Sequence, residues 1–216
     1  MARSAKRWTM AAAAAGLALL AVTPAAAQEN DLGGFFIEVP VGLTMPVGEG
    51  ASAGLYDPSF VVGVNLGYLF SLGGWSAALG PAVDAHYGIG NVEDGFRSHD
   101  GGEDDLYLGR LRVIGGARFV VGFGSAFLFM RVGVGVDYVH ASWDPPIYDQ
   151  DNDDSDAAAG LVAGVGMGYM FTDLIGMTFL IDFPVGFHNA DDDGDPIDWD
   201  DEMVDLETSL AVVFNL

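Results

Sequence analysis

Cysteine is absent from the 216 residues, which excludes disulfides and attachment of a lipid anchor through a thiol. Positive charge is also scarce: after residue 7 there is no lysine and there are only five arginines, Arg97, Arg110, Arg112, Arg118 and Arg131. With all 31 carboxylates, these five arginines give residues 28–216 a formal charge of 5 − 31 = −26, against −23 for the full sequence. Such a charge argues against a partner made of nucleic acid, because phosphates require a basic surface. Half of the residues are nevertheless hydrophobic, too many for a disordered acidic chain.

Long apolar runs are missing except at the N-terminus. Arg3, Lys6 and Arg7 precede an apolar run over residues 8–22, and Ala25-Ala26-Ala27 follows it. A basic start, a short apolar stretch and an Ala-x-Ala end are typical of a secretory signal peptide. An anchoring helix is the alternative, but the run is rich in alanine and barely long enough to span a bilayer. We therefore expect residues 1–27 to be removed on export and residues 28–216 to form one domain.

The rest of the chain alternates between bulky apolar and small or polar residues, as strands with one apolar face do. The last stretch, DLETSLAVVFNL, is the clearest, and we expect it to pair with the first strand because an unpaired edge this apolar would aggregate. Eight segments have this pattern: 35–45, 60–70, 75–87, 106–119, 127–139, 157–170, 174–187 and 205–216. They predict an all-β fold, an eight-stranded antiparallel up-and-down transmembrane β-barrel.

The connections between these segments alternate in length. Four are long (47–59, 88–105, 140–156 and 188–204) and three are short (71–74, 120–126 and 171–173). The long connections contain 22 of the 31 carboxylates. Long loops on one side and tight turns on the other are typical of outer-membrane barrels, with the loops extracellular and the turns periplasmic.

Period two alone does not say which face is outside. In a lipocalin-like soluble barrel the bulky face would point inward, where it would overfill the narrow interior of eight strands. Aromatic residues favour the membrane barrel, because they fall into two belts, as at two membrane interfaces. One belt, near the short turns, contains Phe35, Phe70, Trp75, Phe119, Phe127, Tyr169 and Phe214; the other contains Phe60, Tyr87, Tyr107, Tyr138 and Phe187.

Signal peptide, eight alternating strands, four long loops and the amphipathic last strand together resemble the small outer-membrane β-barrels of Gram-negative bacteria, of the OmpA, OmpX and OmpW type. The resemblance implies residence in the outer membrane after passage through the periplasm. It also implies contact with outer-membrane lipid and lipopolysaccharide, and insertion by the barrel assembly machinery. The implied role is non-enzymatic: structural, surface interaction, or permeation of small solutes or ions. No surface partner is identifiable.

Charged residues on the lumen-facing side are the first candidate site. They are Glu38, Asp84, Arg110, Arg112, Arg118, Arg131, Asp137, Asp182 and Glu207. Because buried guanidinium groups need carboxylate partners, we expect Asp84 and Asp137 to pair with Arg110 and Arg112. Asp182 and Glu207 are expected in the same half of the lumen, and Arg118 and Arg131 beside Glu38. The favoured interpretation is a salt-bridged, largely closed lumen; a pore is the alternative.

Two weaker candidates lie in the long loops. Asp191, Asp193, Asp195 and Glu202 occupy positions one, three, five and twelve of a calcium loop, but Pro196 stands where such a loop has glycine. No cofactor is expected beyond weak binding of Ca²⁺ or Mg²⁺ there.

His140 and Ser142 form a His-x-Ser pair, which some lipid A-modifying barrels of this kind carry. A lipid A-modifying enzyme is therefore an alternative function. A third is an OmpW-like conduit for small apolar molecules, which the luminal charges argue against. We expect no enzymatic activity and no catalytic residue.

Overall fold

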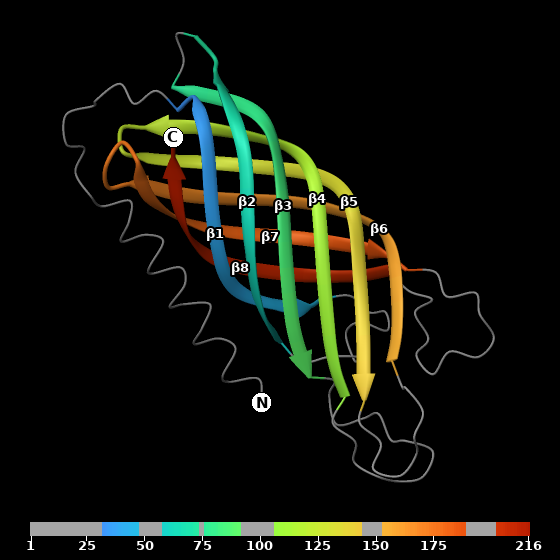
Figure 1. The fold of residues 1–216 in the computed structure, drawn as a ribbon. Coiled ribbons are helices and arrows are strands. Elements are labelled where there is room, and N and C mark those ends of the chain that lie inside the picture. The colour runs from blue at the N-terminus through green and yellow to red at the C-terminus, as the bar shows by residue number, and fades with distance from the viewer. Residues whose placement is uncertain (1–31, 48–57, 74–75, 92–105, 144–152, 189–201) are drawn as a thin grey trace.

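The eight expected strands form one closed barrel. The computed structural model describes residues 32–47, 58–73, 76–91, 106–143, 153–188 and 202–216. The strands are β1 (Gly34–Pro46), β2 (Ser59–Ser71), β3 (Ala77–Asn91), β4 (Leu106–Phe123), β5 (Ala126–Trp143), β6 (Asp153–Met170), β7 (Ile175–Phe187) and β8 (Glu202–Asn215). Each is antiparallel to its neighbours in the chain, and β8 pairs with β1 (Figure 1). The predicted fold class is therefore confirmed. No helix that could cross a membrane occurs in the described ranges.

The ring closes between the last strand and the first, as expected. The N–H of Phe35 donates to the carbonyl of Leu216 at 3.2 Å, and the N–H of Leu216 donates to the carbonyl of Phe35 at 2.7 Å. At the other end of the seam the N–H of Val47 donates to the carbonyl of Val204 at 3.0 Å. Closure pairs the backbone polar groups of β1 and β8, which a sheet edge in lipid would leave without partners.

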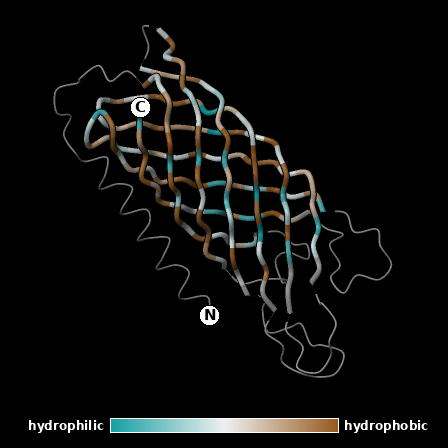
Figure 2. The backbone as a smooth tube through the Cα atoms, in the orientation of Figure 1, coloured by the Kyte–Doolittle hydropathy of each residue, from teal (hydrophilic) through white to brown (hydrophobic). Residues whose placement is uncertain are grey.

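Bulky side chains point outward along the strands. In β2, Phe60, Val62 and Leu66 are exposed, whereas Val61 and Asn65 between them are buried. Hydropathy alternates along the strands in the same way (Figure 2). The arrangement is the reverse of a soluble protein and matches a barrel whose outside faces lipid.

Several strands are longer than the sequence pattern indicates. The segment 120–126, expected as a turn, is mostly strand: β4 continues to Phe123, β5 begins at Ala126, and only Gly124 and Ser125 connect them. Gly124 has a φ of +67°, a conformation that glycine adopts easily and that tight hairpin turns require. β6 begins at Asp153, four residues earlier than expected, because it continues to pair with the outer part of β5.

One residue of the predicted aromatic belts is placed wrongly. Phe127 is buried inside the barrel, because it lies two residues before Phe129 on the inward-facing side of β5. Most other described members point outward as predicted, among them Phe35, Phe70 and Phe60.

Two adjacent glycines on β4 allow a matched test of the packing between strands. A Cβ at Gly116 would collide with backbone atoms of Val132 and Gly133 on β5, whereas a Cβ at Gly115 would have no neighbour within 4 Å. We expect Gly116→Ala to lower the free energy of unfolding by about 1–3 kcal/mol, the usual effect of overpacking. Gly115→Ala should change it little. Guanidinium unfolding in detergent micelles measures both; equal effects of the two variants would contradict this account.

Candidate functional site: the barrel lumen

A network of charged and polar side chains fills the lumen. We call it the luminal network; its members are Glu38, Asn65, Asp84, His86, Arg110, Arg112, Arg118, Arg131, Asp137, Asp182, His188, Asp205 and Glu207. All are buried, and they come from all the strands but β6, with His188 directly after β7. The nine residues singled out from the sequence are among them. Each of the four arginines contacts at least one carboxylate.

Arg110 lies nearest the long-loop end of β4 among these arginines. Its Nε donates to Oδ1 of Asp137 at 2.8 Å, and its Nη1 pairs with Asp205 of β8. His188 lies beside this group: its Nδ1 is 2.7 Å from Oδ2 of Asp156, and its Nε2 is 3.6 Å from Oδ2 of Asp137. The cluster therefore links β4, β5, β6 and β8 and the residue that follows β7.

Arg112 is the next arginine along β4, and it pairs with Glu207 of β8. The other oxygen of Glu207 is 2.7 Å from Nδ1 of His86. Nε2 of His86 is 2.7 Å from Oδ1 of Asn65, whose Nδ2 donates to Glu38 at 3.1 Å. A continuous series of hydrogen bonds thus crosses the barrel from β4 to β1.

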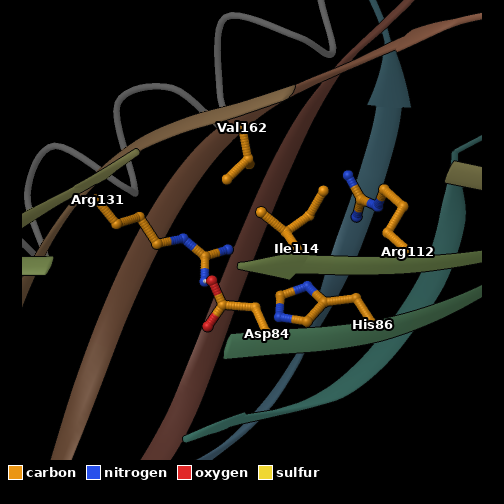
Figure 3. A pocket seen from close by; sticks show the side chains of 6 residues that line it. All are labelled: Asp84, His86, Arg112, Ile114, Arg131 and Val162. Carbon is orange, nitrogen blue, oxygen red and sulfur yellow. Dashed lines mark ion pairs between the residues drawn. The ribbon is translucent and has the colours of Figure 1, made fainter. Parts of the chain in front are cut away.

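Arg131 of β5 occupies the middle of the lumen between two carboxylates. Its Nη1 is 2.6 Å from Oδ2 of Asp84, and its Nε donates to Oδ1 of Asp182 at 2.8 Å. Arg131 and Asp84 point toward each other beside a cavity of about 10 Å³, also lined by His86 and Arg112 (Figure 3). A space of this size holds at most one water molecule.

Arg118 lies between a carboxylate and two aromatic rings. Its Nη1 is 2.7 Å from Oε2 of Glu38, and its Nη2 donates to Oε1 at 2.8 Å. The guanidinium carbon lies 4.7 Å from the ring centroid of Phe36 and 3.8 Å from that of Phe129. The faces of both rings attract the cation in addition to the carboxylate of Glu38.

An apolar cluster fills the short-turn end of the lumen. It consists of Phe36, Leu69, Ala78, Ala82, Val120, Phe127, Phe129, Leu180 and Val213, all buried. Leu32, just before β1, and Met170, at the end of β6, pack against it. The sequence interpretation of a lumen lined by small and charged residues missed this cluster. The period-two alternation does indicate this cluster, because its residues lie at inward-facing positions of their strands.

The expected pairing of the arginines is only partly correct. Asp84 and Asp182 contact Arg131, whereas they were assigned to the half of the lumen that contains Arg110 and Arg112. The order of strands is readable from the sequence, but the stagger between them is not, and the stagger decides which side chains share a level. In the ladder Asp84 lies opposite Ile114, two residues beyond Arg112 toward the short turns. Period-two alternation also places Asp205 and His86 on the inward-facing side, two residues from Glu207 and Asp84, although they were not among the candidates chosen from the sequence. No sequence signal indicated His188 as a partner.

The other sequence candidates are less informative. His140 points toward the outside of β5 and is half-exposed. Ser142 pairs with Tyr107 in the ladder, and its side chain lies outside the described residues, as does that of Glu202 at the start of β8. Asp191, Asp193 and Asp195 also lie outside the described residues. Within the described part of the chain no three histidines or carboxylates are placed to hold a metal ion.

The architecture matches solved membrane barrels. Neisserial surface protein A is 13% identical to the chain, covers 84% of it with 97% of its own length, and superposes with a TM-score of 0.50. The chain has the fold of the small outer-membrane β-barrels. A major outer membrane protein from Thermus thermophilus (12% identity, 86% and 100% coverage, TM-score 0.48) is also similar. So is the outer membrane protein OprG from Pseudomonas aeruginosa (13% identity, 87% and 98% coverage, TM-score 0.46).

No family model and no curated sequence matches the chain. The likeness to solved barrels, at low sequence identity, confirms the predicted fold.

Arg131 tests whether pairing stabilises the barrel. Removal of one partner of a buried ion pair leaves an uncompensated charge, so Arg131→Met should lower the free energy of unfolding by about 3–5 kcal/mol. Replacement of the whole group, Arg131→Met with Asp84→Asn and Asp182→Asn, should restore most of that loss, because no unpaired charge is left. Guanidinium unfolding in micelles compares the two; a triple variant no more stable than the single one would contradict this reasoning.

His188 makes stability depend on pH. Burial lowers the pKa of His188, but its contacts with the carboxylates of Asp137 and Asp156 outweigh burial and raise the pKa above its ordinary value. The resulting stabilisation is complete below the ordinary pKa of about 6.5 and is lost as pH rises through the raised value. His188→Gln should therefore flatten the dependence of unfolding free energy on pH in this range. His140→Gln, on the outer face, is the control, and an equal flattening by it would refute the assignment to His188.

Proposed function

We propose that the protein is a non-enzymatic integral outer-membrane barrel with a closed lumen, and that its role is structural or a surface interaction. The proposal includes removal of residues 1–27 on export. It also places the acidic loops outside the cell and the short turns in the periplasm. The apolar exterior and the fold support this location. Lipid, lipopolysaccharide and the barrel assembly machinery are then its expected partners.

One observation carries the proposal: the lumen contains two obstacles in series. Ion pairs of Arg110, Arg112 and Arg131 cross it, and the apolar cluster closes its short-turn end. An ion that entered from the loop side would have to displace paired charges and then lose its water against Phe36 and Phe129. This arrangement favours a structural or surface role over permeation.

The two alternatives have less support. A conduit for apolar molecules needs a continuous apolar path through the lumen. The luminal network interrupts such a path at Arg118 and Glu38, directly next to the apolar cluster. A lipid A-modifying enzyme would use His140 and Ser142, and no contact of the described side chains joins His140 to a carboxylate that could orient it.

Planar-bilayer recording of the barrel, refolded from residues 28–216, tests closure. The wild type should be nearly silent at neutral pH, and Arg110→Ala should stay silent because the remaining ion pairs and the apolar cluster still close the lumen. A variant with Phe36→Ala, Phe129→Ala, Arg110→Ala, Arg112→Ala and Arg131→Ala opens both obstacles and should conduct. Its current should be cation-selective, since Asp84, Asp182 and Glu207, which these arginines neutralised, then line the path.

Correct folding of each variant is established first by its heat-modifiable migration on gels. A large, steady current through the folded wild type would overturn the closed lumen and make permeation the function.

A further inference from the structure

The outer surface near the short turns has a groove that the closed lumen does not explain. It runs across β4, β5, β6 and β7, between two parallel rows of outward-pointing side chains. One row follows the ladder from Phe119 through Met130 and Val165 to Ile181; the other follows it from Val121 to Phe179. The groove has a volume of about 430 Å³, within the range of small-molecule sites.

Gly166 and Phe129 lie at the floor of the groove. Gly166 occupies an inward-facing position of β6, and the ring of Phe129 from the neighbouring strand fills the luminal space beneath its backbone. The two rows of outward-pointing side chains stand on either side of this floor. The ladder from β5 to β7 is continuous here, so the floor is unbroken.

The chemistry of the lining defines the ligand. Every lining side chain is apolar, so a bound polar group would lose its hydrogen bonds to water without replacement. At one end the groove reaches Phe123, next to the turn at Gly124 and Ser125; at the other it reaches Ile181 inside β7. A ligand that fits this groove is therefore a hydrocarbon chain inside the bilayer. Any polar group that it carries lies at the level of the short turns.

We propose that this groove binds one acyl chain of a phospholipid from the leaflet that faces the short turns. The proposal rests on the outer-membrane location and orientation proposed above, which put this end of the barrel in the phospholipid leaflet, opposite the acidic loops. Met130 and Val165, both more than half exposed, form the centre of one wall of the groove. The site holds the chain against the barrel, in contrast to lipids that merely surround it.

Filling the groove tests the proposal. Val165→Trp places a large ring between the two rows, on a lipid-facing position that tolerates apolar bulk. Val83→Trp is the matched control: Val83 is outward-facing on β3, 51% exposed against 54% for Val165, and lies outside the groove. The protein, residues 28–216 folded in mild detergent, is mixed with phosphatidylethanolamine and measured by native mass spectrometry, with lipopolysaccharide in a parallel arm.

The wild type and Val83→Trp should retain one phospholipid at activation energies that strip the detergent, and Val165→Trp should lose that mass. Equal retention by all three proteins would leave only surrounding lipid and overturn the site. Retention of lipopolysaccharide in place of phospholipid would overturn the choice of ligand. Because the measurement is made in detergent, its failure is distinguishable from failure of the proposed function, which membrane fractionation and bilayer recording decide.

Discussion

The structure depends on the pairing of guanidinium groups with carboxylates inside a barrel too narrow to hydrate them. Eight strands leave an interior that side chains fill, so a charge directed inward loses most of its water. Arg112 and Arg131 therefore need Glu207, Asp84 and Asp182, which lie on strands across the lumen. The same contacts that satisfy the charges connect distant strands of the ring. The ion pairs across the lumen and the cohesion of the barrel are then two results of one requirement.

The two ends of the lumen meet that requirement differently. Toward the long loops charges are neutralised by charges, whereas toward the short turns Phe36, Phe129 and their neighbours exclude both charge and water. Arg118 lies at the boundary, with Glu38 on one side and two aromatic faces on the other. Arg118 therefore belongs to the luminal network and at the same time packs against the apolar cluster.

Period-two alternation was sufficient to predict the barrel, because lipid outside and a filled lumen inside impose opposite requirements on successive residues. The same reasoning identified Arg110 and Glu207 as luminal, since the alternation along a strand alone decides which side chains point into the lumen. It failed where the answer depends on stagger: Asp84 contacts Arg131, not Arg110 or Arg112. It also failed at Phe127, where an aromatic residue near a turn suggested an interface although parity placed it inside. The 430 Å³ groove could not be predicted, because its rows belong to four strands whose register the sequence does not show.

His86 joins two of the ion pairs in the lumen. Asn65 donates its Nδ2 hydrogen to Glu38, which fixes its Oδ1 toward Nε2 of His86, and Nδ1 of His86 faces Glu207. Through this ring and the Asn65 amide, the ion pair of Arg112 with Glu207 is continuous with the ion pair of Arg118 with Glu38. The four strands β1, β2, β3 and β8 each contribute one of these linking side chains, and β4 contributes both arginines. Residues that carry no cation of the ion pairs therefore extend the network across the lumen.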